Sequence, residues 1–127
     1  MKISRLSVLF LVNGIFTLIG SIILFFMPSL IFGVSGIQLT LGTNFIVYLL
    51  GATSVSLSIL SFYAAYLLDK SSIKGISITF FVFHLTTGII GIFAIWNGLS
   101  SLIWGSIFIH FFFALSFLIL GVLNNSL

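Results

Sequence analysis

Long apolar runs separated by short polar breaks dominate the chain. The runs predict helices over about 6–27, 44–68, 73–96 and 101–123. Each run has the roughly 20 residues that a helix needs to cross a hydrocarbon core about 30 Å thick. The pattern therefore predicts a single all-α domain, an integral membrane four-helix bundle with up-down-up-down topology.

The segment between the first two helices is expected to differ from a plain loop. Pro28 ends the first helix, because its ring disfavours helix at the preceding residue and it has no N–H to continue the hydrogen bonding. Residues 29–43 combine glycines with apolar side chains, a composition too apolar for a free aqueous loop and too broken for a span. We expect a short helix or a partly re-entrant turn at the outer interface.

Two polar breaks mark the starts of the later helices. Residues 69–72 contain two serines, either of which can cap the third helix, and Asp69 is a solvated boundary or cap residue. The pair Asn97-Gly98 predicts a turn, after which Ser100 or Ser101 can cap the last helix. Both connections are short, so consecutive helices are expected to be antiparallel.

Basic residues predict the orientation. Lys2 and Arg5 precede the first helix, and Lys70 and Lys74 follow the second. Four spans place both groups on one face, which the positive-inside rule makes cytoplasmic. We expect a multi-pass protein of the inner (cytoplasmic) membrane with a cytoplasmic N-terminus and C-terminus. The apolar run continues to Met27 without a small-x-small site, so it is interpreted as the first span and not as a cleaved leader.

Composition narrows the function classes. Charged residues make up 4% and hydrophobic residues 61% of the 127 positions, too little polar surface for a water-soluble fold. The net charge of +3 is too small and scattered for a nucleic-acid footprint. Membrane lipids, and a possible homo-oligomeric or membrane-protein partner, are the expected partners. The chain has no cysteine, which excludes disulfides and thiolate chemistry; no cofactor and no metal site are predicted.

Each predicted helix carries one stripe of small or polar residues, the kind that brings helices together in lipid. The stripes are Asn13, Thr17, Gly20 and Ser21; Gly51, Ser54, Ser58, Ser61 and Ala65; His84, Thr87, Gly88 and Gly91; and Ser106, His110, Ala114 and Gly121. We predict that the four stripes converge. Most of the hydroxyls are expected to bond to carbonyls one turn earlier.

His84, His110 and Asn13 are the candidate ligand-binding residues, because polar groups deep in a membrane are costly and often functional. His84 lies roughly 13 residues before the 97–100 turn and His110 roughly 11 after it, so at about 1.5 Å per residue both lie near mid-bilayer. They are expected to face each other. Two interpretations stay open: each histidine bonds a hydroxyl or the Asn13 amide and fixes helix register, or the histidines form the polar end of a ligand pocket.

Catalysis is not predicted, because it needs a reactive group with a supporting partner and only the histidines qualify. The leading hypothesis is a non-enzymatic bundle acting as a structural, accessory or lipid-binding component of the membrane. One alternative is a small oligomeric transporter or channel with its path along the histidines. Another is a haem- or quinone-binding redox protein, in which two imidazoles would ligate the haem iron.

A series of short motifs covers most of the chain. They are Pro28 and Gly33 after the first helix, Leu50-Gly51-Ala52, residues 69–74, Val82-Phe83-His84, Asn97-Gly98, Trp104, His110 and residues 114–117. In these motifs the chain resembles a family of small, uncharacterised four-transmembrane-helix membrane proteins from bacteria. The resemblance implies a four-helix membrane fold in a prokaryotic inner membrane. It carries neither an activity nor a functional residue.

Overall fold

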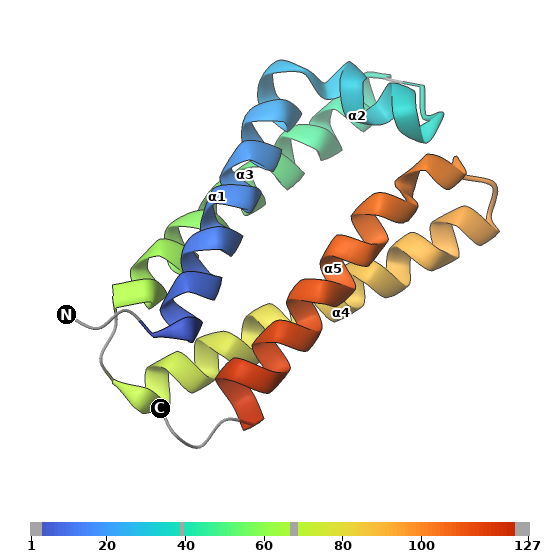
Figure 1. The fold of residues 1–127 in the computed structure, drawn as a ribbon. Coiled ribbons are helices and arrows are strands. Elements are labelled where there is room, and N and C mark those ends of the chain that lie inside the picture. The colour runs from blue at the N-terminus through green and yellow to red at the C-terminus, as the bar shows by residue number, and fades with distance from the viewer. Residues whose placement is uncertain (1–3, 39, 67–68, 124–127) are drawn as a thin grey trace.

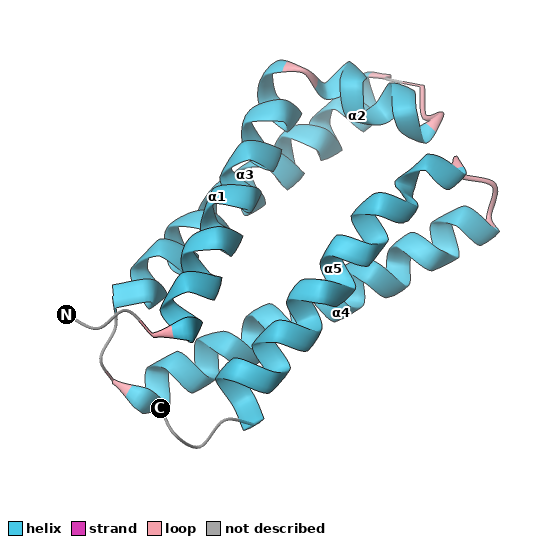
Figure 2. Cartoon of the chain, viewed as in Figure 1, coloured by secondary structure: helices cyan, strands magenta, loops and turns pink. Residues whose placement is uncertain are grey.

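The computed structural model describes residues 4–38, 40–66 and 69–123, and these are helical nearly throughout (Figure 2). The elements are α1 (Arg5–Phe26), α2 (Pro28–Ser35), α3 (Leu41–Tyr66), α4 (Lys70–Trp96), the 3-10 turn η1 (Ser101–Ile103), α5 (Trp104–Phe117) and the π-helical turn η2 (Leu118–Leu123). Four helical stretches are long and apolar enough to cross a membrane: α1, α3, α4 and the run Ser101–Leu123. The predicted all-α four-helix bundle is confirmed.

The bundle consists of two antiparallel hairpins. α1 packs mainly against α3, and α4 packs mainly against α5 and η2. Figure 1 shows that the hairpins lie close together near the start of α1 and diverge toward α2. At the far end they meet again, where the Ser100 N–H donates to the Ser35 carbonyl over 3.3 Å. The hairpins therefore contact each other along the first half of α1 and again at the far end, and their backbones are separated in between.

The predicted break at Pro28 and the short helix after it are both present. α1 ends at Phe26, and Pro28 begins α2, where its missing N–H removes no helical bond. α2 ends at Ser35, and its C-cap is Gly36, whose φ of 74° is a left-handed conformation that glycine adopts without strain. α3 starts at Leu41, earlier than predicted, because Thr43 N–H donates to Thr40 Oγ1 over 3.2 Å and caps the first turn. Its predicted last residues, 67–68, lie outside the described residues.

Asp69, and not a serine, caps α4. Its carboxylate accepts the Ser72 N–H over 2.7 Å, so the helix begins at Lys70 with both predicted serines inside its first turn. The alternative prediction, that Asp69 is the cap, is confirmed. The hydrogen bonds from Ser72 hold the pKa of the Asp69 carboxyl below its usual value. Ser100 caps η1 as predicted, accepting the Leu102 N–H over 3.3 Å.

Glycines bring the helices of each hairpin together. A Cβ placed on Gly51 of α3 would lie 3.1 Å from the Phe25 ring of α1. A Cβ on Gly91 of α4 would lie 2.6 Å from Ile107 of α5. A larger residue at Gly91 would force the Ile107 side chain to shift, and one at Gly51 would press on the Phe25 ring, so glycine at these positions favours close packing within each hairpin.

An aromatic core joins the hairpins in the half of the bundle nearest the start of α1. Its buried members are Leu6, Leu9, Phe10, Ala64, Ala65, Phe80, Phe113 and Phe117. The Phe10 ring of α1 lies 5.9 Å from that of Phe80 in α4 and 5.2 Å from that of Phe117 in α5. Many other large apolar side chains are exposed, as expected for helices whose surroundings are lipid.

Candidate functional site: a buried chain of polar side chains

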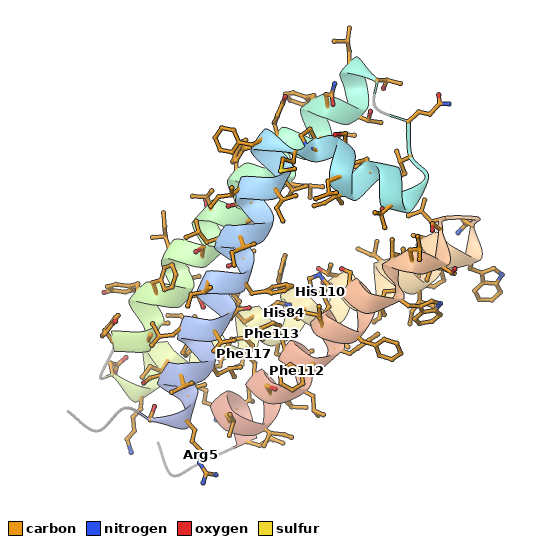
Figure 3. The ribbon with its side chains drawn as sticks, turned by 45° about the horizontal axis from the view of Figure 1, so that its top comes forward. Arg5, His84, His110, Phe112, Phe113 and Phe117 are labelled. Atoms are coloured by element: carbon orange, nitrogen blue, oxygen red, sulfur yellow. The ribbon has the colours of Figure 1, made fainter. Side chains whose placement is uncertain are left out.

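The two histidines meet directly above the aromatic core. His84 on α4 and His110 on α5 face each other, and their Nδ1 atoms are 2.9 Å apart (Figure 3). The prediction that they lie at matched height and face each other is confirmed. The helices position them because Gly88 and Gly91 allow α5 to approach α4 closely one turn further along.

A hydrogen-bonded chain continues from His84 into the other hairpin. His84 Nε2 lies 2.9 Å from Asn13 Oδ1 of α1. Asn13 Nδ2 donates to Ser61 Oγ of α3 over 3.1 Å, and Ser61 Oγ donates to the Phe10 carbonyl over 2.7 Å. We call His110, His84, Asn13 and Ser61 the polar chain. It takes one side chain from each long helix and ends on a backbone carbonyl.

Most of the polar chain is completely enclosed. Asn13 and Ser61 are 0% exposed and His84 is 1% exposed, whereas His110 is half-buried. The His84 ring stacks on Phe113 with ring centroids 5.1 Å apart, and the Phe83 ring meets its edge at 5.1 Å. These rings fix the plane of the His84 imidazole, so both of its nitrogens point at their partners.

Every hydrogen bond in the polar chain is donated in the same direction, from His110 toward Ser61 and the Phe10 carbonyl. The Ser61 hydroxyl gives its hydrogen to the Phe10 carbonyl, and therefore accepts from the Asn13 amide. The Asn13 carbonyl oxygen then accepts from His84 Nε2–H. A neutral imidazole carries one N–H, so His84 Nδ1 is a bare acceptor and the bond between the histidines needs Nδ1–H of His110.

Packing between the hairpins stops next to His110. The rings of Phe16 on α1 and Phe113 on α5 are 5.7 Å apart across the hairpins, yet Phe16 remains 41% exposed. One turn further along α1, a Cβ on Gly20 would have no neighbour within 4 Å. One turn before His110 on α5, Ser106 is exposed. We call the space between the hairpins beside Phe16 and Gly20 of α1 and Ser106 and His110 of α5 the interhairpin region.

The predicted convergence of the four stripes is correct at only one height along the bundle, that of the polar chain. The stripes meet at the polar chain, but Gly88 and Gly91 pack inside their own hairpin, and Gly20 and Ser106 have open space beside them. The reason is that the hairpins diverge beyond this level (Figure 1).

The prediction that most hydroxyls bond back to their own helix is confirmed by Thr17, Ser21, Thr53, Ser56, Ser77, Thr79, Thr86, Thr87 and Ser116. Ser58 and Ser61 differ. They donate across the hairpin to the Gly14 and Phe10 carbonyls of α1, over 2.8 Å and 2.7 Å. These two serines therefore tie α3 to α1.

The sequence-based prediction named Asn13, His84 and His110, and the structure brings all three together. It did not name Ser61 as a site residue, although Ser61 anchors the amide. It also missed Phe113, which lies three residues after His110 on the same face of α5 and stacks on His84. That three-residue spacing was the available signal.

The geometry limits the chemistry. A metal ion lies about 2 Å from each imidazole nitrogen that binds it, so iron between two imidazoles would hold those nitrogens about 4 Å apart. The 2.9 Å separation of the Nδ1 atoms is that of a hydrogen bond and does not fit bis-histidine haem. No group of three or more His, Cys, Asp and Glu gathers within the part of the chain that the structure describes.

Fold and hydropathy together define the class: a helical bundle with four candidate membrane spans, as in multi-pass membrane proteins. Comparison with protein-family models, with curated proteins and with solved structures finds no match for the chain. The resemblance to small bacterial four-helix membrane proteins stays a prediction.

Proposed function

We propose that the protein is a non-enzymatic, lipid-binding component of the cytoplasmic membrane that holds a lipid-soluble molecule between its two hairpins. The observation that carries this proposal is the position of His110. It is half-buried at the edge of the interhairpin region and hydrogen-bonded to a buried polar chain. A fixed polar group beside an apolar, incompletely packed region is the usual composition of a small-molecule site.

Lipid supplies the occupant. The Phe16 ring contacts Phe113 of the other hairpin and is still 41% exposed, and beside Gly20 there is space for further atoms. In a bilayer such a surface is covered by hydrocarbon, and a molecule with one weakly polar group gains a hydrogen bond at His110 in addition. The polar chain also gives the bundle a structural role, since it links all four long helices at one level.

The proposed orientation places the start of α1 in the cytoplasm. Arg5 begins α1, and Lys70 and Lys74 lie in the first turns of α4, at the same end of the bundle (Figure 1). Trp96, which is 81% exposed, lies at the opposite end, where an aromatic side chain suits the outer interface. Both termini would then face the cytoplasm.

Conduction of ions or protons is less well supported than binding. The polar chain ends on an amide and a backbone carbonyl, neither of which passes a proton on at ordinary pH. Between that carbonyl and the cytoplasmic end lie the buried rings of Phe80 and Phe117. Among the residues that the structure describes, the polar groups therefore do not form a path across the bundle.

Native mass spectrometry of the protein released from mild detergent tests the proposal. We expect wild-type protein to retain a stoichiometric lipid-soluble adduct. Gly20→Leu should lose the adduct, because the new side chain fills the space where Gly20 has no neighbour within 4 Å. Thr53→Val is the matched control, since the exposed Thr53 hydroxyl donates to the Leu49 carbonyl of its own helix. A wild-type protein free of adduct, or one whose adduct survives Gly20→Leu, would overturn the proposal.

A further inference from the structure

We infer that the molecule held between the hairpins is a neutral, lipid-soluble alcohol or phenol whose hydroxyl donates a hydrogen bond to Nε2 of His110. This inference rests on the proposed function and names the chemical class of the ligand. It follows from the direction of the polar chain, from the accessibility of one nitrogen and from the depth of the site.

The direction of the polar chain fixes the protonation of His110. Its Nδ1 must carry the hydrogen, because His84 Nδ1 is the bare acceptor in their 2.9 Å bond. A neutral His110 then has a lone pair and no hydrogen on Nε2. If the hydrogen of His110 were on Nε2 instead, its Nδ1 and the Nδ1 of His84 would both be acceptors and could not bond to each other. His84 could become the donor only by moving its own hydrogen from Nε2 to Nδ1, which would break its hydrogen bond to Asn13. The buried residues of the polar chain therefore determine that Nε2 of the half-buried His110 is a hydrogen-bond acceptor.

That lone pair is accessible. Within the described residues, no hydrogen bond uses His110 Nε2, and no buried side-chain nitrogen or oxygen atom is without a partner. Nε2 therefore lies at the surface of the chain, where a ligand atom can reach it. His110 is half-buried, whereas His84 beside it is 1% exposed, so His110 is the histidine that a ligand can reach (Figure 3).

The depth of the site selects against charged headgroups. From the cap of η1 at Ser100 to His110 the helix advances by about 15 Å, which is half of a hydrocarbon core of about 30 Å. The interhairpin region contains no charged residue, and Arg5, Lys70 and Lys74 lie at the far end of their helices. A phosphate at this depth would lack a cation and would be strongly disfavoured.

The unprotonated Nε2 of His110 also discriminates among neutral molecules, because it can only accept a hydrogen bond. A hydroxyl donates to it, whereas an ether, ester or quinone carbonyl presents another acceptor and gains nothing. A hydroquinone would therefore fit this site better than the corresponding quinone. Because one net hydrogen bond of this kind is typically modest, we expect an alcohol to bind roughly three- to tenfold more tightly than its methyl ether.

Histidine-selective ¹⁵N NMR on the full chain tests the inference. The protein is placed in micelles of an amine oxide detergent, which has no hydroxyl, and titrated with 1-dodecanol or with dodecyl methyl ether. Without a probe, we expect Nδ1–H on His110 and Nε2–H on His84. We expect 1-dodecanol to shift the Nε2 resonance of His110 and to bind more tightly than the ether, and His110→Leu to abolish this preference.

The outcomes separate the two proposals. Equal binding of alcohol and ether, or Nε2–H on His110 in the free protein, would overturn the inference while leaving lipid binding intact. Failure of both probes to bind, in a protein that retains its histidine tautomers and hence its fold, would count against the proposed function itself. Asn13→Leu is a second variant, because it removes the acceptor that fixes the direction; it should bring the alcohol-to-ether preference close to one.

Discussion

Replacing Asn13 by leucine removes the link between the hairpins, so it measures how much the polar chain stabilises the bundle. The substitution leaves Nε2–H of His84 without an acceptor at a residue that is 1% exposed. A buried donor left unpaired costs about 1–3 kcal/mol. The lost bond to Ser61 Oγ adds about 0.5–1.5 kcal/mol. Hydrogen bonds between membrane helices fall at the lower end of such ranges, so we expect a loss of about 2 kcal/mol.

A double-mutant cycle separates the hydrogen bond from the effects of size. Once Asn13 is leucine, His84→Leu no longer breaks the bond to the amide, and it removes the unpaired donor. The two substitutions should therefore be less than additive, with a coupling of about 1 kcal/mol. The free energies of unfolding are measured by titrating SDS into dodecylmaltoside micelles and following circular dichroism.

Thr53→Val is the control for this cycle. It also removes a polar group from a long helix, but the Thr53 hydroxyl is exposed and bonds within α3. Its effect should stay within about 0.5 kcal/mol. The explanation would be refuted if Asn13→Leu and Thr53→Val had equal effects, or if the cycle showed no coupling.

Three further predictions concern packing and capping. Gly91→Ala should destabilise the bundle by about 1–3 kcal/mol, because its Cβ would lie 2.6 Å from Ile107; a stability equal to wild type in the same SDS titration would contradict this. Gly20→Ala, with no neighbour within 4 Å, should be neutral or stabilising by up to about 1 kcal/mol, and a clear loss would mean that the region is already filled by protein. The Asp69 carboxyl has a lowered pKa, so its cap stabilises α4 above the unfolded-state pKa and is lost as pH falls through the folded value. Amide hydrogen exchange at Ser72, corrected for the intrinsic exchange rate, should therefore be faster at acidic than at neutral pH. In Asp69→Ala it should be fast at both acidic and neutral pH.

Hydropathy and single punctuating residues were enough to predict the helices. Pro28 has no N–H and must interrupt a helix, and a run of apolar residues as long as α1 has few alternatives to a span. The boundaries were harder to predict. Asp69 and Ser72 compete to cap the same turn, and the carboxylate wins because it lies one residue before the first helical N–H groups.

The site was predictable in its members but not in its geometry. His84 and His110 lie at similar distances from one turn, roughly 13 and 11 residues, so their meeting at about the same height follows from helical rise. That Asn13 bonds His84 depends on how two hairpins pack against each other, and apolar helix faces without strong periodicity do not encode this. Likewise, the contact between the Phe16 and Phe113 rings, after which the hairpins diverge, depends on how the two hairpins pack and not on the pattern of either helix.

The division into two hairpins has a consequence for biosynthesis. α1 and α3 contact each other extensively and both precede α4 in the chain, so the first half can pair in the membrane while the second is still being translated. Assembly then finishes with a docking step, in which Phe10 meets Phe80 and the imidazole of His84 finds the Asn13 amide. Two polypeptides divided between α3 and α4 should accordingly reassemble into the intact bundle when they are made in the same cell.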